Sequence, residues 1–182
     1  AAVAAVNDAI WNLEDLYGTP EDWTKDYERL KADMPSAGAC KDTLLKDAGT
    51  MLSCLETISR IQKDALKLYV YAFLRSDENL GIAENTERKT QAQTLLVQLG
   101  AQTSWLNPTI LAAGKARVDG FRQAEPKLNE VFGFMLDNIL RAEAHTLSPE
   151  SESVLAESAD VLSRASTTYD ILADAELPFP TI

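Results

Sequence analysis

The sequence predicts an all-α protein, built as a helical bundle in which a long antiparallel helix pair is followed by a smaller helical subdomain. Apolar side chains recur at helical spacing through most of the 182 residues. The chain has only 8 glycines and 7 prolines, which leaves little material for the many tight turns of an all-β fold. We therefore expect residues 1–113 to form a helical subdomain that contains the long pair. Residues 114–182 should form a second one that ends in an extended segment.

The first helix is predicted from its start and stop signals. Thr19 is suited to cap a helix, and Pro20 is suited to the first helical position. Pro35 should stop the helix, because proline lacks the amide hydrogen that an interior position donates. The residues expected to face inward from this helix are Trp23, Tyr27, Leu30 and Met34.

The long pair is predicted from two extended apolar stripes. Asp47 should cap a helix over Ala48–Ser76, which at 1.5 Å per residue is roughly 44 Å long. A turn near residues 79–81 separates it from a helix over Glu84–Leu106. Two long helices joined by a short turn pack antiparallel, because neither buries its stripe alone. The stripe of the first helix comprises Met51, Leu52, Leu55, Ile58, Ala65, Leu66, Tyr69, Val70 and Phe73.

The second half of the chain predicts shorter helices. A wide apolar face is formed by Leu128, Val131, Phe132, Met135, Leu136, Ile139 and Leu140. We expect Met135 to be buried, because it lies inside this dense repeat. Ser148 and Pro149 mark the start of a further helix, and the final LPFPTI is better suited to an extended segment. This tail is expected to be poorly ordered, to pack back on its own helices, or to pair with another copy of the chain.

Composition limits the classes of partner and compartment. A formal net charge of -11 repels phosphate backbones, which argues against nucleic-acid binding. No apolar run approaches the roughly 20 residues that cross a bilayer, so we expect no membrane association. The two cysteines, Cys40 and Cys54, are too few for a disulfide framework, and we expect reduced structural thiols in a cytoplasmic protein.

The chain holds one histidine, His145, and this limits its catalytic chemistry. A zincin site needs two histidines at positions i and i+4 of a helix with a glutamate between them, and that motif is absent. A nucleophile pair of His145 with Cys40 or a serine would need signatures that the sequence does not contain. We therefore assign no catalytic, cofactor-binding or metal residue, and expect the chain alone to be no enzyme. His145 is expected to make a hydrogen bond at a helix junction.

The segment LKLYVYAFLRSDEN, residues 66–79, is the best candidate for a functional surface. Tyr69, Tyr71 and Phe73 cannot all face one side of a helix, so one set of aromatic rings could enter the core and another could line a groove or meet a second domain. The alternative is two packed helix faces and a terminal ion pair. The candidate groove or domain-contact residues are Tyr69, Tyr71, Arg75, Asp77, His145 and Phe179.

Five segments, in order, resemble the oligoendopeptidase F family of thimet-oligopeptidase-like zinc metallopeptidases. They are WNLEDLY, TPEDW, YVYAFLRSDEN, HTLSPESE and LPFPTI, and together they run from Trp11 to Ile182. In that family this region is an N-terminal helical domain that precedes the catalytic domain. The two domains enclose a channel that admits oligopeptides. The family's zinc ligands and general base lie beyond this region, so the resemblance carries none of them onto this chain.

The resemblance implies a non-catalytic lid or substrate-gating domain of a cytoplasmic peptidase. Its partners would be the catalytic domain of the same polypeptide and, in the full-length protein, oligopeptide substrates, with zinc bound only in the full-length protein. Two other hypotheses remain open on the residues alone. One is a free-standing helical module that binds another protein, and the other is a small enzyme that uses His145.

Overall fold

The computed structural model describes residues 11–79, 81–142 and 169, and within them every regular element is an α-helix. The helices are α1 (Pro20–Asp33), α2 (Pro35–Ala39), α3 (Ala48–Glu78), α4 (Ala83–Thr103), α5 (Leu106–Ala124) and α6 (Pro126–Arg141). The prediction of an all-α helical bundle is confirmed. The chain divides into two compact units, Ala1–Leu140 and Arg141–Ile182. The second lies almost wholly outside the described residues, so the boundary expected at residue 113 stays a prediction.

The first helix begins where its capping signals predict. The Thr19 hydroxyl oxygen accepts a hydrogen bond from the Asp22 amide at 3.2 Å, and Pro20 occupies the first turn. α1 ends at Asp33, and Pro35 opens the short helix α2 at once instead of leading into a loop. A proline that stops one helix also suits the first position of the next.

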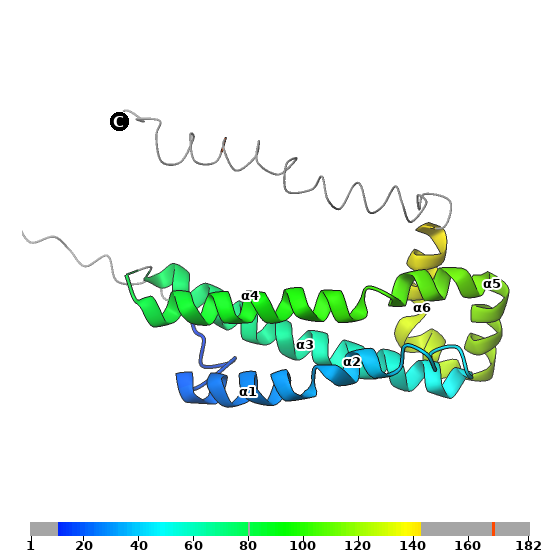
Figure 1. Ribbon diagram of the computed structural model, residues 1–182, viewed down its shortest axis with the longest axis horizontal. Coiled ribbons are helices and arrows are strands. Elements are labelled where there is room, and N and C mark those ends of the chain that lie inside the picture. Colours follow the sequence, from blue (N-terminus) through cyan, green and yellow to red (C-terminus); the bar gives the residue numbers. More distant parts are fainter. Residues whose placement is uncertain (1–10, 80, 143–168, 170–182) are drawn as a thin grey trace, which may run out of the picture. The chain divides into compact units, whose positions relative to one another are not determined.

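The long antiparallel pair is confirmed as α3 and α4, which lie side by side in Figure 1 and make the most extensive helix contact of the described residues. The Asp47 carboxylate caps α3 by accepting from the Thr50 amide at 2.7 Å. α3 also contacts α1, α2 and α5. It is therefore the central helix of the first unit, and its side chains form much of the core.

The apolar stripe of α3 turns out to have two parts. It is confirmed over Met51–Ile58, but beyond Gln62 only Ala65 of its predicted members is buried. Leu66 is 54% exposed, whereas Tyr69, Val70 and Phe73 are half-buried. The residues that are buried over residues 61–76 are Ile61, Ala65, Leu68, Tyr71, Ala72 and Ser76. The physical reason is that α3 is apolar on two sides, and only the packing of α1 and α4 decides which side forms the core.

The two cysteines form a disulfide, Cys40–Cys54, so the expectation of reduced thiols is wrong. Cys40 directly follows α2 and Cys54 lies on α3. A turn over residues 41–46 folds α2 back against α3 and brings the two Cα atoms to 5.9 Å, within the range that a disulfide spans. A separation of 14 residues along the chain does not by itself reveal this approach.

The last two helices depart furthest from the predicted pattern. Gly114 has φ of +75° inside α5, where the helix kinks. On α6, Met135 is half-buried and Val131 is 54% exposed, so their predicted burial is wrong. The side of α6 that faces the core carries Leu128, Phe132, Leu136 and Ile139. An apolar face of seven residues is wider than the surface that the neighbouring helices cover, so its margin stays in solvent.

Among the described residues, no helix has the combination of length and apolarity that crossing a bilayer requires.

Candidate functional site

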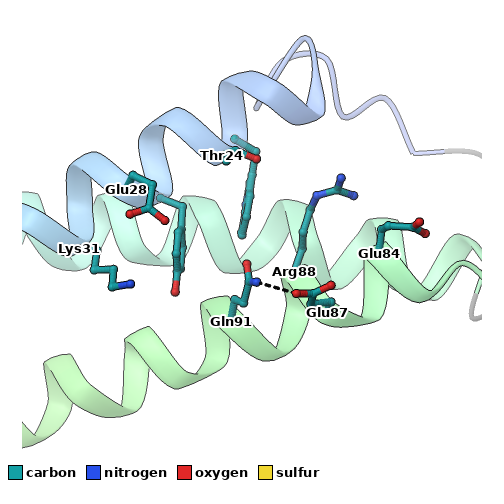
Figure 2. A pocket seen from close by; sticks show the side chains of 9 residues that line it. Thr24, Glu28, Lys31, Glu84, Glu87, Arg88 and Gln91 are labelled. Carbon is teal, nitrogen blue, oxygen red and sulfur yellow. Dashed lines mark hydrogen bonds between the residues drawn. The ribbon is translucent and has the colours of Figure 1, made fainter.

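A groove between α1 and α4 combines aromatic and charged side chains. Its volume is about 350 Å³. α1 and α4 each pack against α3. The groove lies between α1 and α4, in front of α3 as drawn in Figure 2. The residues that line the groove are Trp23, Thr24, Tyr27, Glu28, Lys31, Glu84, Glu87, Arg88 and Gln91.

Two aromatic rings of α1 hold the inner part of the groove in place. Trp23 and Tyr27 lie one turn apart and stack with ring centroids 5.3 Å apart and planes inclined by 13°. The Trp23 indole N–H donates to the backbone carbonyl of Leu68 on α3 at 2.9 Å, and the side chain is 1% exposed. This bond ties α1 to α3. It leaves the half-buried ring of Tyr27 as the aromatic surface nearest the opening.

The walls of the groove carry charges of both signs. In Figure 2 Lys31 comes from α1 and Glu84 and Arg88 come from α4, so the two helices present charges to the same space. The Lys31 ammonium lies 5.9 Å from the centroid of the Tyr27 ring. Arg88 donates to the side-chain oxygen of Asn85 at 3.2 Å.

The remaining polar residues of the groove bond locally. Gln91 donates to the Glu87 carboxylate at 3.1 Å, and the Thr24 hydroxyl donates to the Pro20 carbonyl at 3.0 Å. The lining contains no cysteine, serine or histidine. This combination of side chains is suited to hold a polar or zwitterionic group beside an aromatic ring.

The predicted aromatic candidates lie elsewhere on α3. Tyr71 is 1% exposed and packs edge-on against Tyr17, with ring centroids 5.3 Å apart and planes inclined by 80°. Tyr69 is half-buried and lies against Phe73 at 5.7 Å. Tyr71 is therefore a core residue, while part of Tyr69 reaches the surface. Neither lines the groove.

Arg75 and Asp77 do not pair with each other. Arg75 makes an ion pair with Glu78 at 2.9 Å, and Asp77 pairs with Lys89 on α4 at 3.3 Å. The nearby Tyr71 and, after it, the bond with Glu78 raise the pKa of Arg75, so its charge is fixed. The Arg75 carbonyl accepts from the Asn85 side chain at 3.1 Å, and Asn85 in turn accepts from Arg88. Arg75 is thus one step removed from the groove.

Tyr17, which packs on Tyr71, has a hydroxyl group with a perturbed pKa. The Tyr17 hydroxyl donates to the Asp26 carboxylate at 3.1 Å. Burial, followed by this hydrogen bond, raises the pKa of Tyr17 above its ordinary value. This bond and the contact with Tyr71 join residues 11–19, which precede α1, to α1 and α3.

Two predicted site residues, His145 and Phe179, lie outside the described residues. Within the described part of the chain, no group of three or more His, Cys, Asp or Glu side chains is placed to hold a metal ion. With one histidine in the whole sequence, the donor set does not fit the two-histidine site of a zincin.

Sequence reasoning missed the groove, although one part of the signal was present. Trp23 and Tyr27 were expected to face inward, and an aromatic pair at i and i+4 on a helix is typical of a stacked contact. The other wall comes from Glu84, Glu87 and Arg88, which lie far along the chain on α4. Their charged pattern is that of an ordinary solvated helix face, so only the fold shows that they face α1.

Comparison with known proteins relates the chain to one group of peptidases. The sequence profile of the family described as Oligopeptidase F matches residues 110–179. Oligopeptidase PepF of Bacillus subtilis is 28% identical over 94% of this chain and 26% of its own length. The plasmid-encoded oligoendopeptidase F of Lactococcus lactis is 25% identical over 94% of this chain and 29% of its own length.

Two solved structures share the fold. Oligoendopeptidase-F from Enterococcus faecium superimposes with a TM-score of 0.70 at 29% identity, over 90% of this chain and 32% of that one. A putative peptidase from Chlamydophila abortus superimposes with a TM-score of 0.71 at 26% identity, over 94% of this chain and 29% of that one. The chain thus spans about a quarter to a third of the proteins it matches. The resemblance carried by the five sequence motifs is confirmed: over nearly its whole length, this chain is similar to the N-terminal part of oligoendopeptidase F.

Proposed function

We propose that this chain is the non-catalytic substrate-gating domain of an oligopeptide-hydrolysing zinc metalloendopeptidase similar to oligoendopeptidase F. The observation that carries the proposal is the unequal coverage of the alignments. They include 94% of this chain but only 26% to 29% of the curated relatives' length. A segment of that size, with one histidine, is suited to be an accessory part of a larger peptidase.

Gating follows from rigidity and shape rather than from reactive groups. α1 packs on α3, α2 packs on both α3 and α4, and the disulfide links the end of α2 to α3. These contacts hold the domain rigid, so it can exclude a folded protein without changing its own fold. Steric exclusion of large substrates needs a stiff wall, and long helices packed on one another supply one. The groove between α1 and α4 would add a place for a polar segment of peptide beside Tyr27.

Chemistry would belong to the remainder of the full-length protein. In that part a bound zinc ion would activate the water that attacks the peptide carbonyl. The residues of this chain would contribute by restricting access and by forming one side of the channel. The partner of the domain would be the catalytic domain of the same polypeptide.

A cytoplasmic location is also proposed, on the resemblance alone. The disulfide gives it no support, because stable disulfides are rare in the reducing cytosol and common in oxidising compartments.

The gating proposal is tested by the length dependence of hydrolysis. The full-length protein and a version that lacks these 182 residues are compared on quenched fluorescent peptides of increasing length and on a folded protein of similar composition. Removal of the domain should raise the rate on long substrates relative to short ones, and adding the separate chain should restore the original ratio. An unchanged ratio would show that the domain does not gate.

A second candidate function, a free-standing interaction module, is favoured by one observation. Phe134 is 80% exposed and lies one turn from Val131, which is 54% exposed, on the outer side of α6. The two hypotheses differ in the coding sequence that they require downstream of Ile182. A continuing reading frame that encodes the two-histidine zinc motif supports the gating domain, whereas a stop codon immediately after Ile182 supports the module.

A further inference from the structure

A second cavity lies directly beside the disulfide. It has a volume of about 240 Å³, and both cysteines are among its lining residues. The other residues around it are small, and five of them carry a hydroxyl group. They are Ser36, Ala39, Thr43, Thr50, Ser53 and Thr57. No charged side chain lines the cavity. A disulfide that borders an open cavity can be reached by a small reactant.

The two sulfur atoms have different surroundings. Cys54 is 3% exposed and belongs to the core, whereas Cys40 is half-buried at the end of α2. The backbone carbonyl of Cys40 accepts from the Thr43 amide at 3.1 Å and from its hydroxyl at 3.3 Å, so this cysteine lies in a hydrogen-bonded surface turn. An incoming thiolate therefore meets Cys40 first.

We propose that the Cys40–Cys54 disulfide is a reversible modification site for low-molecular-weight thiols, with Cys40 as the residue that becomes modified. The sulfur of the incoming thiolate forms a bond to Sγ of Cys40. The bond between Cys40 and Cys54 breaks, and its electron pair goes to Sγ of Cys54, which then takes up a proton from solvent. One disulfide replaces another, so the step needs no oxidant or reductant beyond the thiol itself.

The greater exposure of Cys40 decides which sulfur is attacked, and the position of Cys54 makes the step reversible. The released Cys54 takes up a proton and stays in the core as a thiol. From there it remains within reach of the mixed disulfide at Cys40, because both residues border the same cavity. In the reverse step the Cys54 thiol gives its proton to solvent, its sulfur attacks Sγ of Cys40, and the small thiol leaves as a thiolate, which restores the original bond. This proposal does not depend on the gating function.

The test uses reduced glutathione, a tripeptide thiol, with the full 182-residue chain. After incubation the reaction is stopped with acid, free thiols are alkylated, and trypsin digestion separates Cys40 (residues 32–41) from Cys54 (residues 47–60). We expect the glutathione adduct on the first peptide to exceed that on the second at least tenfold. Equal adducts, a preference for Cys54, or reaction only after unfolding in urea would each overturn the proposal.

Two matched variants distinguish the accessibility of each cysteine from the effect of losing the disulfide. Cys54→Ser leaves the thiol of Cys40, and Cys40→Ser leaves that of Cys54, while both lose the same cross-link. With a small aromatic disulfide reagent, Cys54→Ser should react at least tenfold faster, and circular dichroism should show both variants folded. Equal rates would contradict the assignment to Cys40.

A third variant tests the cavity as the route. Ser53 is exposed on α3 and lines the cavity, so Ser53→Phe should fill part of it while both cysteines remain. We expect exchange with glutathione to slow by at least threefold relative to the unmodified chain. An unchanged rate in a variant whose disulfide is intact would overturn the role of the cavity.

Discussion

The α3–α4 pair and the α5–α6 segment are both helical, but they differ in how fully their apolar residues are covered. α3 is contacted on several sides, and the side chains of Ile61, Leu68 and Ala72 are at most 1% exposed. α6 buries one side and leaves Val131 and Phe134 in solvent, and α5 is interrupted at Gly114. The difference shows that a helical apolar pattern predicts the helix but not the extent of its burial, which depends on how many neighbours contact it.

The largest effect should come from a charge in the covered region. Leu68 is 1% exposed and lies where α1 meets α3, so Leu68→Asp buries a carboxylate without a partner. We expect a loss of about 4 kcal/mol or more in the free energy of unfolding. Urea denaturation followed by circular dichroism measures it. On α6, Met135→Asp should cost much less, because Met135 is half-buried. A similar loss in both variants would contradict the contrast between the two regions.

A comparison within α6 sharpens the contrast. Leu136 is fully buried, whereas Phe134, two positions earlier, is 80% exposed. Leu136→Ala should lower the free energy of unfolding by about 2–4 kcal/mol through the cavity it leaves. Phe134→Ala should change it by less than about 0.5 kcal/mol, as substitutions in solvent do. If the Phe134 variant were the less stable of the two, α6 would have to pack on its other side.

Substitutions at two glycines compare the kinked helix α5 with the continuous helix α4. Gly114 adopts φ of +75° and ψ of 158°, so Gly114→Ala should cost about 1–3 kcal/mol of stability through backbone strain. Gly100 lies within α4, and a Cβ there would meet nothing within 4 Å. Gly100→Ala should therefore stabilise the chain by about 0.5–1 kcal/mol. Thermal unfolding of the two variants gives the signs, and a stabilised Gly114 variant would rule out the kink.

The smallest effect concerns the loss of stability at acidic pH. The hydrogen bond from Ser36 and the ion pair with Arg60 at 2.7 Å lower the pKa of Asp33 below its ordinary value of 3.8. The folded state therefore holds this proton less tightly than the unfolded chain does. The stabilisation is complete above pH 3.8 and is lost as the pH falls through the folded-state pKa.

Asp33→Asn removes the titrating group, so its urea midpoint should fall less than that of the unmodified chain between about pH 7 and pH 3. Asp42→Asn, at an exposed position in the turn after Cys40, serves as the control. An equal fall in the Asp33 variant and the unmodified chain would mean that the Asp33 carboxylate does not contribute to acid sensitivity.

Local signals predicted the helices well because capping chemistry acts within a few residues. Thr19, Pro35 and Asp47 mark helix ends without reference to the rest of the chain. The phase of α3 beyond Gln62 was not predictable, because both of its faces are apolar there. The disulfide and the groove were not predictable either, since each joins segments whose approach depends on the packing of α1, α2 and α4 on α3.

The indole of Trp23 offers a built-in optical probe of this packing. It is shielded from water, bonded to the Leu68 carbonyl and stacked on Tyr27, whereas the ring of Trp11 is 57% exposed. Emission from a shielded indole lies at shorter wavelength than emission from one in water. Detachment of α1 from α3 would therefore appear as a red shift before the remaining helices melt. The chain has a third tryptophan, Trp105, so in a variant with both Trp11→Phe and Trp105→Phe the fluorescence spectrum would follow the opening of the groove.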